Sequence, residues 1–481
     1  MATQTLAHPS LRDRSSQAVL LNDVHSQLNP TLAAEVVHPR SANDVALAVH
    51  SAATAGRAVA IAGGRHAMGG QQFVTNGTVI SMSGMDRVLE LDARCGHVEV
   101  EAGIQWPELI GELHRRQPGS AAPWTIAQKQ TGADRLSIGG AVAANVHGRG
   151  LAMRPFVSDV EALTIVTADG SVLRCSRREN QELFRLAVGG YGLFGVVTQV
   201  RLRLTRQQKL RRTVEIIDLE ELPAAFAGRI ADGFTYGDFQ FAIDNDSPEF
   251  LRRGVFSCYQ PVDPSTPIPH SQVVLTEPAW RELLHLAHCD KSAAFQRYAE
   301  HYLRTSGQIY KSDTHQLATY LDDYHREIDV RHGATCRGSE MISELYVPRE
   351  ALPRFMKAVA GDFRSQRVNC IYGTVRLIEQ DDETFLAWAR EPWACVIFNI
   401  HADHSPAGLR ASAETFRRLI DRAAALDGCY YLTYHRYARK DQVLRCYPRF
   451  PEFLEHKRRH DPDELFFSDW YAHYNRMFGR R

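Results

Sequence analysis

The chain has 481 residues, 44% of them hydrophobic and 23% charged, which is typical of a water-soluble globular protein with two or three domains. Its 56 basic residues balance its 56 acidic residues, so we expect no binding to nucleic acid or to an anionic membrane surface. No apolar run approaches the length of about 18 residues that a membrane span needs, and the N-terminus lacks the pattern of a secretory signal.

The predicted elements begin with a β-α-β unit. A strand at residues 35–38 is closed by Pro39, and Ser41 caps a helix whose apolar residues repeat along one face as far as Gly56. The next strand covers residues 59–62. Because α/β folds bind ligands at the carboxyl ends of parallel strands, we expect a ligand at the loop after residue 62.

That loop has the sequence Gly63-Gly-Arg-His-Ala-Met-Gly-Gly70. Glycine permits positive φ angles and a close approach of a ligand to the main chain, and free N–H groups beside Arg65 suit a pyrophosphate. His66 stands in the middle of the loop, where a packing role is uncommon. Taken alone, the motif also fits an ordinary glycine-rich turn with a solvated histidine.

Short strands without helices between them follow at residues 78–82, 88–91 and 97–101, and a helix is expected at residues 106–116. A second glycine-bearing segment then covers residues 131–148 and is rich in alanine and valine. Its small side chains again permit close approach to a flat ligand.

The next predicted elements are a hairpin and a helix. The hairpin covers residues 160–175 and turns at residues 168–170, which read Ala-Asp-Gly. The helix at residues 180–188 leads through a third glycine run, residues 189–195, into a strand at residues 196–204.

Beyond about residue 206 the glycine clusters end and longer amphipathic helices appear, which predicts a mixed α+β second domain. The nine cysteines are scattered and form no C-x-x-C pair, so we expect reduced thiols in the cytoplasm, no disulfides and no metal site. The elements expected in this part of the chain lie at residues 239–243, 280–287, 293–303, 342–347, 369–378, 395–400 and 451–459.

Three motifs together resemble the vanillyl-alcohol-oxidase, or PCMH-type, family of FAD-linked oxidoreductases. They are the loop at residues 63–70, the Ser-Ile-Gly-Gly-Ala and Asn-Val-His-Gly parts of residues 137–148, and the run at residues 188–195. Within the family, the motifs are most similar to those of the alditol and aldonolactone oxidases and the decaprenylphosphoryl-ribose oxidases.

The resemblance implies an α+β fold, in which a PCMH-type two-subdomain FAD-binding domain is joined to a mixed α/β substrate (cap) domain. It also implies domain boundaries. We expect an N-terminal segment at residues 1–29, the FAD-binding domain at 30–206, the cap domain at 207–428, and a C-terminal segment at 429–481 that returns to the FAD domain.

The same resemblance implies FAD as cofactor, with the first glycine loop on its pyrophosphate and His66 bonded covalently to the flavin. Because residues 131–140 contain no cysteine, we expect a single covalent link. The residues implied to bind the cofactor are Ala62, Gly63, Gly64, Arg65, His66, Ala67, Met68, Gly132, Ser137, Gly139, Gly140, Asn145, Val146, Val197 and Tyr431.

Oxidation of an alcohol at a flavin needs a group that accepts the hydroxyl proton and a donor that stabilises developing charge. Tyr434 stands where several relatives carry a catalytic lysine, and Thr374 where alditol oxidases tend to carry an acid, so a simple polyol substrate is in doubt. The candidate catalytic residues are His147, Glu344, Arg376, Tyr434 and His435.

Each of these candidates also has a structural interpretation. His147 could bond a backbone carbonyl, and Glu344 and Arg376 could form an ion pair on facing strands. Cys395 falls near a pocket cysteine of the ribose oxidases, although a cysteine on an apolar strand is usually part of the core.

We therefore expect an FAD-dependent enzyme that dehydrogenates a hydroxyl group of a sugar-like or other small molecule by hydride transfer to flavin N5. Oxygen or another acceptor, such as a quinone or a keto partner, would reoxidise it. The aromatic cluster at residues 430–437 keeps open the oxidation of a C–N bond or the oxidative cyclisation of an aromatic secondary metabolite. A non-catalytic flavin-binding module is a further alternative. The sequence leaves the substrate, the acceptor and the oligomeric state open.

Overall fold

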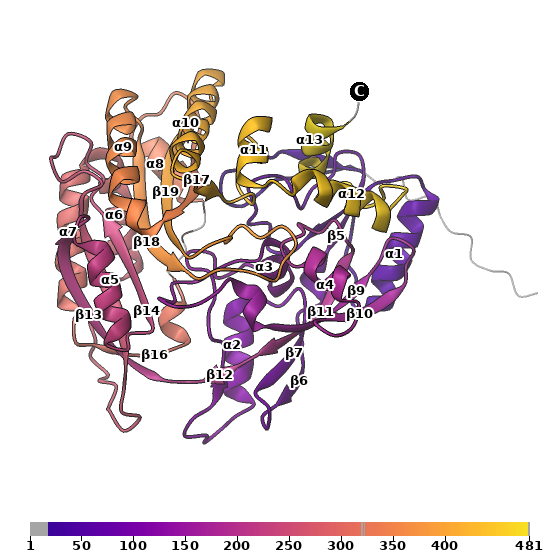
Figure 1. Ribbon diagram of the computed structural model, residues 1–481, viewed down its shortest axis with the longest axis horizontal. Helices are drawn as coiled ribbons and strands as arrows, with labels where there is room; N and C mark the ends of the chain where they lie inside the picture. Colours follow the sequence, from indigo (N-terminus) through magenta and orange to yellow (C-terminus); the bar gives the residue numbers. More distant parts are fainter. Residues whose placement is uncertain (1–17, 319–320, 322, 480–481) are drawn as a thin grey trace, which may run out of the picture.

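The structure, a computed structural model, describes residues 18–318, 321 and 323–479. The first 17 residues of the expected N-terminal segment lie outside this range. Helices and strands are mixed throughout the described chain, which confirms the α+β expectation. One half of the molecule is built from residues before about 206 and the other from the residues that follow, and the C-terminal helices, drawn in yellow, lie over the first half (Figure 1).

A small parallel sheet opens the first half and confirms the predicted β-α-β unit. Helix α1 (Ala42–Thr54) joins β3 (Glu35–Val37) to β4 (Val59–Ala62), and both strands pair in parallel with β5 (Thr78–Ser81), which lies between them. Before this unit, β1 (Val19–Leu21) pairs antiparallel with β2 (Thr31–Ala33).

Local sequence explains why helix α1 forms where it does. The hydroxyl oxygen of Ser41 accepts a hydrogen bond from the backbone N–H of Asp44 at 3.1 Å, which is the expected N-cap. Val45, Val49 and Ala52 then bury one face of the helix. The carboxyl end of β4 leads directly into the first glycine loop.

The second sheet of the first half is antiparallel and five-stranded, in the order β10-β9-β11-β7-β6. The predicted hairpin and the short strands expected at residues 88–91 and 97–101 are found in it, within about two residues of their expected ends, whereas the strand expected at residues 78–82 is β5 of the parallel sheet. Its strands are β6 (Val88–Asp92), β7 (His97–Glu101), β9 (Val160–Val166), β10 (Val172–Ser176) and β11 (Val196–Arg203). The helices of this region are α2 (Trp106–Arg115), α3 (Ile138–Ala144) and α4 (Gln181–Ala187).

Helix α3 lies inside the second glycine segment and was not predicted from the sequence. Its seven residues are all glycine, alanine, valine or isoleucine, so no amphipathic period marks it. The Ser137 hydroxyl caps it by accepting from the N–H of Gly140, and Asn145 ends it in the left-handed conformation with φ of 47°.

An eight-stranded antiparallel sheet dominates the second half, in the order β16-β13-β15-β14-β18-β19-β17-β20. Its strands are β13 (Lys209–Asp218), β14 (Tyr236–Phe241), β15 (Arg253–Val262), β16 (Ile309–Lys311), β17 (Gly338–Pro348), β18 (Cys370–Ile378), β19 (Trp393–Asp403) and β20 (Cys429–Tyr430). Pairs of residues facing each other across these strands are Arg212 with Tyr259, Gln240 with Thr374, Arg376 with Cys395, and Glu344 with Ile397. Because side chains alternate along a strand, these residues share one side of the sheet, which we call the cavity face.

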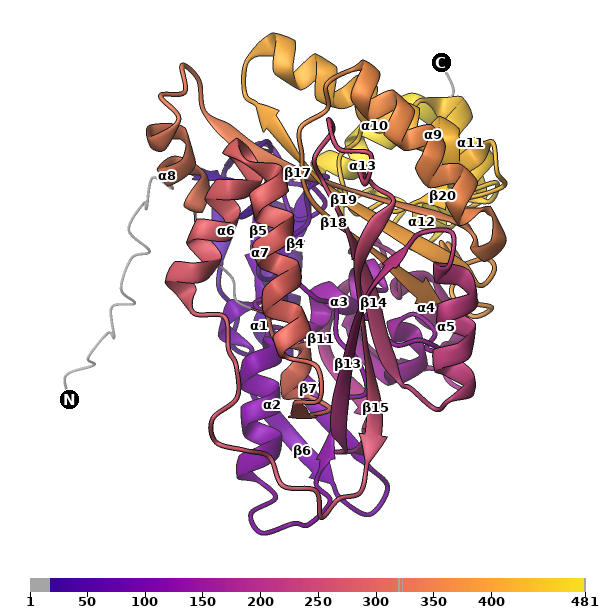
Figure 2. The ribbon, with the colours of Figure 1, turned by 90° about the vertical axis from the view of Figure 1, so that its left-hand side faces the viewer.

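Helices cover both sides of this sheet. Helices α5 (Leu222–Ala231), α9 (Leu352–Ser365) and α10 (Pro406–Ala424) bury apolar residues such as Phe226, Phe355 and Phe416 against the side away from the cavity face. Helix α7 (Lys291–Arg304) lies beside the long strands β13 and β15, and α6 (Glu277–Cys289) packs on α7 and contacts β18 (Figure 2). Helix α8 (Tyr324–Arg331) packs near β17.

The C-terminal part of the chain pairs with the first sheet. The N–H of Val59 on β4 donates to the carbonyl of Leu465 at 2.7 Å, and the N–H of Phe467 donates to the carbonyl of Val59 at 3.0 Å. Helices α11 (Lys440–Cys446), α12 (Phe450–His460) and α13 (Asp469–Phe478) flank this contact. Short elements complete the chain at β8 (Trp124–Thr125), β12 (Thr205–Arg206), Met82–Gly84, Phe156–Asp159, Thr314–Gln316 and Arg349–Ala351.

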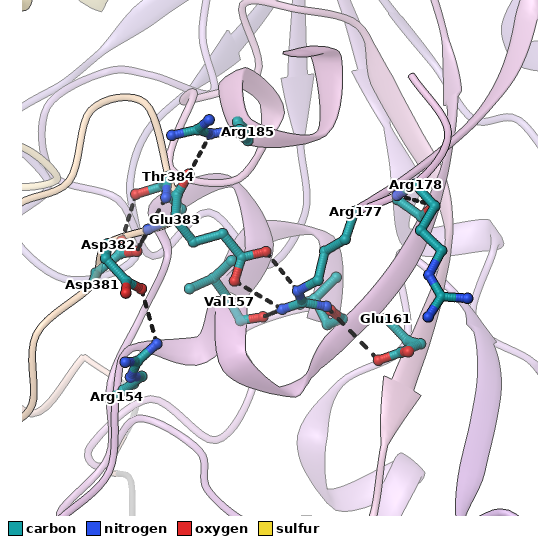
Figure 3. A network of polar contacts seen from close by, with 12 residues as sticks. Arg154, Val157, Glu161, Arg177, Arg178, Arg185, Asp381, Asp382, Glu383 and Thr384 are labelled. Atoms are coloured by element: carbon teal, nitrogen blue, oxygen red, sulfur yellow. Dashed lines mark hydrogen bonds and ion pairs between the residues drawn. The ribbon is translucent and has the colours of Figure 1, made fainter. Parts of the chain in front are cut away.

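The connection from β18 to β19, residues 379–392, reaches back to the first half through polar contacts (Figure 3). Arg177 donates to the backbone carbonyls of Val157 and Val160 and pairs with Glu383 at 2.7 Å. Arg185 donates to the carbonyl of Glu383 at 2.8 Å. These contacts hold the two halves in a fixed relation around the space between them. No helix in the described part of the chain is long and apolar enough to cross a membrane.

Candidate active site

A cavity of about 750 Å³ lies between the two glycine segments and the cavity face of the eight-stranded sheet. One wall comes from residues 63–68 and 130–147, and the other from residues of β13, β14, β15, β17 and β18. The C-terminal segment contributes Tyr431, Thr433 and Tyr434. Parts of the chain that are hundreds of positions apart in sequence therefore meet at one site.

The two glycine segments are packed against each other. A Cβ atom on Gly63 would lie 2.0 Å from the Ser137 hydroxyl oxygen, and one on Gly64 would lie 2.2 Å from the carbonyl oxygen of Arg135. These two glycines are thus required for main-chain contact between the segments. Gly132 is different, since its φ is +84° and a Cβ there would meet open space.

Two buried polar atoms on this side of the cavity have no hydrogen-bond partner within the described residues: the Gln72 side-chain oxygen and the Thr131 hydroxyl. Buried polar atoms are nearly always satisfied in native proteins. Polar atoms left open beside glycine-rich main chain therefore suit a polar ligand, and the phosphate and ribityl part of a dinucleotide has the required donors and acceptors.

His66 lies in the cavity wall, and its Nδ1 is 2.8 Å from Nε2 of His25. Burial lowers the pKa of His66 to about 3, and burial also lowers the pKa of His25. Both imidazoles are therefore neutral near pH 7, which is the protonation state a nucleophilic imidazole needs. His25 was not among the residues singled out from the sequence, because its partner lies 41 positions away.

Most of the predicted cofactor residues line the cavity, and two do not. Ala62 is buried in an apolar cluster with Ala60 and Val79. Asn145 donates from Nδ2 to Asp381 at 3.0 Å and accepts from the N–H of Val157 at 2.9 Å, so it joins segments of the fold. The predicted residues that do line the cavity, among those described, are Gly63, Gly64, Arg65, His66, Ala67, Met68, Gly132, Ser137, Gly139, Gly140, Val146, Val197 and Tyr431.

Four side chains converge on the carboxylate of Glu344, which is only 3% exposed. His147 Nε2 lies 2.6 Å from Oε1, and the Tyr434 hydroxyl donates to Oε2 at 3.0 Å. The Tyr346 hydroxyl also donates to Oε1, and Sγ of Cys395 lies 3.4 Å from the same oxygen. We call His147, Glu344 and Tyr434 the carboxylate triad; all three line the cavity.

Electrostatics keep this carboxylate ionised. Burial by itself raises the pKa of Glu344, but the charge of His147 and the hydrogen bonds from His147 and Tyr346 outweigh it and leave the pKa below its ordinary value. His147 Nδ1 lies 3.0 Å from the carbonyl oxygen of Gly148, which can only accept, so Nδ1 carries a hydrogen.

Arg376 lies on the cavity face but does not pair with Glu344. It is 5% exposed and lines the cavity, and its Nε has no hydrogen-bond partner in the part of the chain that the structure describes. Glu344 instead pairs with His147. Glu344 and Arg376 therefore do not form the ion pair that was considered from the sequence. A buried guanidinium with an open donor suits an oxygen of a substrate.

The two consecutive candidates in the C-terminal segment point in different directions. Tyr434 reaches Glu344, while the ring of His435 stacks on Tyr437 at 5.3 Å between centroids. Burial lowers the pKa of His435 to about 4, and His435 is not among the described residues that line the cavity. Tyr431, which does line it, donates to the carbonyl of Ala144 at 2.6 Å.

Aromatic residues that were not singled out from the sequence pack against the carboxylate triad. Trp388 stacks on Tyr346 at 4.6 Å and lies 5.3 Å from His147. Its indole N–H donates to the carbonyl of Asn145 at 3.0 Å. Trp388 belongs to the connection between β18 and β19, so only the folded chain brings it to His147.

Comparison with known proteins agrees with this geometry. Residues 33–176 match a family model described as FAD binding domain. Cytokinin dehydrogenase 4 of Oryza sativa subsp. japonica is 31% identical over 223 residues, which cover 44% of this chain and 38% of that protein. L-gulonolactone oxidase of Bos taurus is 31% identical over 185 residues, which cover 38% of this chain and 40% of that protein.

A longer match is found in L-gulono-1,4-lactone dehydrogenase of Mycobacterium tuberculosis, which is 25% identical over 442 residues, 90% of this chain and 94% of that protein. The chain thus spans about two fifths of the cytokinin dehydrogenase and nearly the whole of the lactone dehydrogenase. Both glycine segments fall inside the range of the FAD-binding family model. The chain therefore carries an FAD-binding domain within residues 33–176.

Proposed function

We propose that this protein dehydrogenates a hydroxyl group of a sugar-like or other small molecule, with oxygen or another acceptor reoxidising its flavin. The observation that carries the proposal is the carboxylate triad, in which Glu344 and Tyr434 meet His147 of the second glycine segment at one cavity. The match along nearly the full length of a lactone dehydrogenase supports a CH–OH donor, because it includes the cap region where substrates would bind.

We further propose a PCMH-type arrangement, with an FAD-binding domain at residues 30–206, a cap domain at 207–428 and a C-terminal segment at 429–481. The open polar atoms of Gln72 and Thr131 and the space at Gly132 support placement of the dinucleotide on the glycine segments. His66 would hold the flavin covalently. Burial lowers the pKa of His66 to about 3, which supports this role because the neutral imidazole is the nucleophilic form.

When bound, FAD would supply the acceptor for the hydride that leaves the substrate carbon. The chain supplies the rest. Glu344, kept ionised by its neighbours, takes the proton of the substrate hydroxyl, while His147 and Tyr434 hold its two oxygens in place. Arg376 donates to the substrate oxygen and stabilises the charge that develops on it. Burial of the whole group keeps water from competing for these contacts.

A second candidate function is oxidation of a C–N bond, which the similarity to a cytokinin dehydrogenase favours. Aromatic residues at the cavity, such as Tyr431 and Tyr434, would suit a flat substrate. However, that similarity covers less than half of either chain, whereas the lactone dehydrogenase match extends through the cap region. We therefore rank it second.

The test is anaerobic mixing of the purified yellow protein with alditols, aldonolactones, sugars and secondary amines while flavin absorbance is followed. Bleaching by a hydroxyl compound supports the proposal, and bleaching by amines alone supports the second candidate. Acid-precipitated wild-type protein should stay yellow and gain the mass of FAD, whereas His66→Ala should release its colour. Protein that takes up no flavin, or that no compound bleaches, would contradict the proposed function.

A further inference from the structure

At the other end of the cavity face, two buried arginines are set among tyrosine rings. Arg212 on β13 is 7% exposed, and its guanidinium lies 4.3 Å from the ring centroid of Tyr302 and 5.3 Å from that of Tyr259. Arg149, two residues after His147, lies 4.8 Å from the centroid of Tyr259. All four side chains line the same cavity as the carboxylate triad.

The positive charge at this end is not balanced. The carboxylate of Asp238 lies 3.7 Å from Arg149, and no carboxylate in the described chain lies within 4.0 Å of a nitrogen of Arg212. The charged group of Arg212 has one described hydrogen bond, from Nε to the Ser257 hydroxyl at 2.9 Å. A buried charge without a partner costs several kcal/mol, and a cation–π contact offsets only about 0.5–2 kcal/mol of that cost. Two guanidinium groups and one carboxylate therefore leave a site for an anion.

Open polar atoms surround the same place. Arg149 Nε, the Tyr298 hydroxyl and His315 Nε2 are buried and have no hydrogen-bond partner among the residues described. His315 Nδ1 lies 3.2 Å from the carbonyl oxygen of Lys311 and so carries the hydrogen, which leaves Nε2 as an acceptor. Burial and the nearby charge of Arg149 hold the pKa of His315 well below its ordinary value, so Nε2 stays an acceptor. Donors and one acceptor together suit an anion that also bears hydroxyl groups.

The sheet separates this group from the carboxylate triad by a known number of strands. Asp238 is on β14 and Glu344 on β17, with β18 and β19 between them. Three strand spacings of about 4.8 Å separate the main chains of β14 and β17 by roughly 14 Å. A ligand that reaches both ends is longer than a single six-carbon sugar.

We propose that the substrate carries an anionic group, a carboxylate or a phosphate, which Arg149 and Arg212 bind at the far end of the cavity while the oxidised hydroxyl lies at Glu344. Arg149 and Arg212 would thus determine specificity for acidic, elongated, hydroxyl-rich molecules. This inference rests on the proposed function for the identity of the reacting end. The binding of an anion can nevertheless be measured without turnover.

The experiment is calorimetric titration of the FAD-loaded protein with lactobionate, with inorganic phosphate and with neutral lactose. Wild type should bind at least one of the two anions, and the tighter one identifies the carboxylate or the phosphate as the preferred group. Arg212→Met and Arg149→Met should each weaken the binding of that anion by about tenfold or more, since a charge-assisted hydrogen bond contributes about 1.5–3 kcal/mol. Binding of lactose should be the same in all variants.

Arg211→Met is the matched control, because Arg211 is the exposed neighbour of Arg212 on the opposite side of β13. It should bind the anion like wild type, and Arg212→Lys should keep part of the affinity if its melting curve by circular dichroism is normal. The inference fails if neither anion binds wild type, or if Arg211→Met and Arg212→Met lose affinity equally. Those outcomes leave flavin bleaching unaffected, so they are distinct from a failure of the proposed function.

Discussion

Glu344 shows how a single side chain can organise a site. The sequence analysis selected His147, Glu344, Arg376 and Tyr434 one by one, and the structure brings all four to one cavity. A pair between Glu344 and Arg376 was one interpretation of the sequence, whereas the structure pairs Glu344 with His147, which is 197 positions away in the chain. Motif position can indicate that a residue is chemically important. It cannot indicate which distant residue becomes its partner, because that depends on the order of the strands in the folded sheet.

Glu344→Gln tests the proposed role of the carboxylate. An amide has nearly the same shape but cannot take a proton, so we expect turnover to fall by about 10²–10⁴-fold while the flavin content stays normal. The measurement is turnover with the best substrate, normalised to flavin absorbance. Glu350→Gln, at an exposed position after β17, should change neither quantity. An equal loss of flavin and turnover would make Glu344 a structural residue.

At the scale of elements, local signals were sufficient for most of the first half of the chain, helix α3 excepted. The β-α-β unit and the hairpin have caps, turns and regular periods within a few residues, and both were found where expected. Strands β13 and β15 were missed, because charged residues, a glycine and a proline obscure their alternation. Their place in the sheet depends on pairing across long loops, which a local pattern does not contain.

The contact between the two glycine segments gives a prediction at this scale. In Gly63→Ala the new methyl group would displace the Ser137 hydroxyl from the cap of α3, so we expect the free energy of unfolding to fall by about 1–3 kcal/mol and flavin retention to drop. Urea denaturation and flavin absorbance measure the two effects. Adding Ser137→Gly should restore part of the loss.

Gly361→Ala is the control for that substitution, since Gly361 lies inside α9 and a Cβ there meets nothing within 4 Å. It should stabilise the protein by about 0.5–1 kcal/mol, because alanine loses less backbone entropy in a helix. If Gly63→Ala were as stable as wild type and equally yellow, the close contact between the segments would not constrain the site.

At the scale of the whole molecule, the halves are joined at several separate places. The connection between β18 and β19 contacts Arg177 and Arg185 (Figure 3). Trp388 within it reaches both His147 and the carbonyl of Asn145. The sequence predicted a second domain beyond about residue 206. It did not predict that segments of that domain contact the first half again. A loop of mixed composition carries no signal that it will pack against a helix two hundred positions away.

Buried histidines make the stability of the whole molecule depend on pH. Burial lowers the pKa of His325 to about 3 and that of His435 to about 4, from 6.5 when exposed. Below pH 6.5 the unfolded chain therefore binds protons that the folded chain does not, so stability must fall as pH drops from 6.5 toward about 4. Each such histidine adds up to about 1.4 kcal/mol per pH unit to this slope.

We expect His325→Gln and His435→Gln to flatten the dependence of the melting temperature on pH between 6.5 and 4, even where they lower the melting temperature itself. Thermal melts by circular dichroism in a series of buffers measure this dependence. His50→Gln, at an exposed position of α1, should leave it unchanged. A slope identical to wild type in all three variants would mean that these imidazoles titrate alike in both states.

The backbone contact between Val59 and residues 465–467 has a consequence for the order of assembly. Strand β4 ends at the first glycine loop, and its free edge is closed only by residues near the end of the chain. A ribosome will have completed nearly every other element before that edge can be covered. We therefore expect the first glycine loop to reach its final structure late in biogenesis, and a nascent chain that stops short of its last residues would leave that loop without its neighbour.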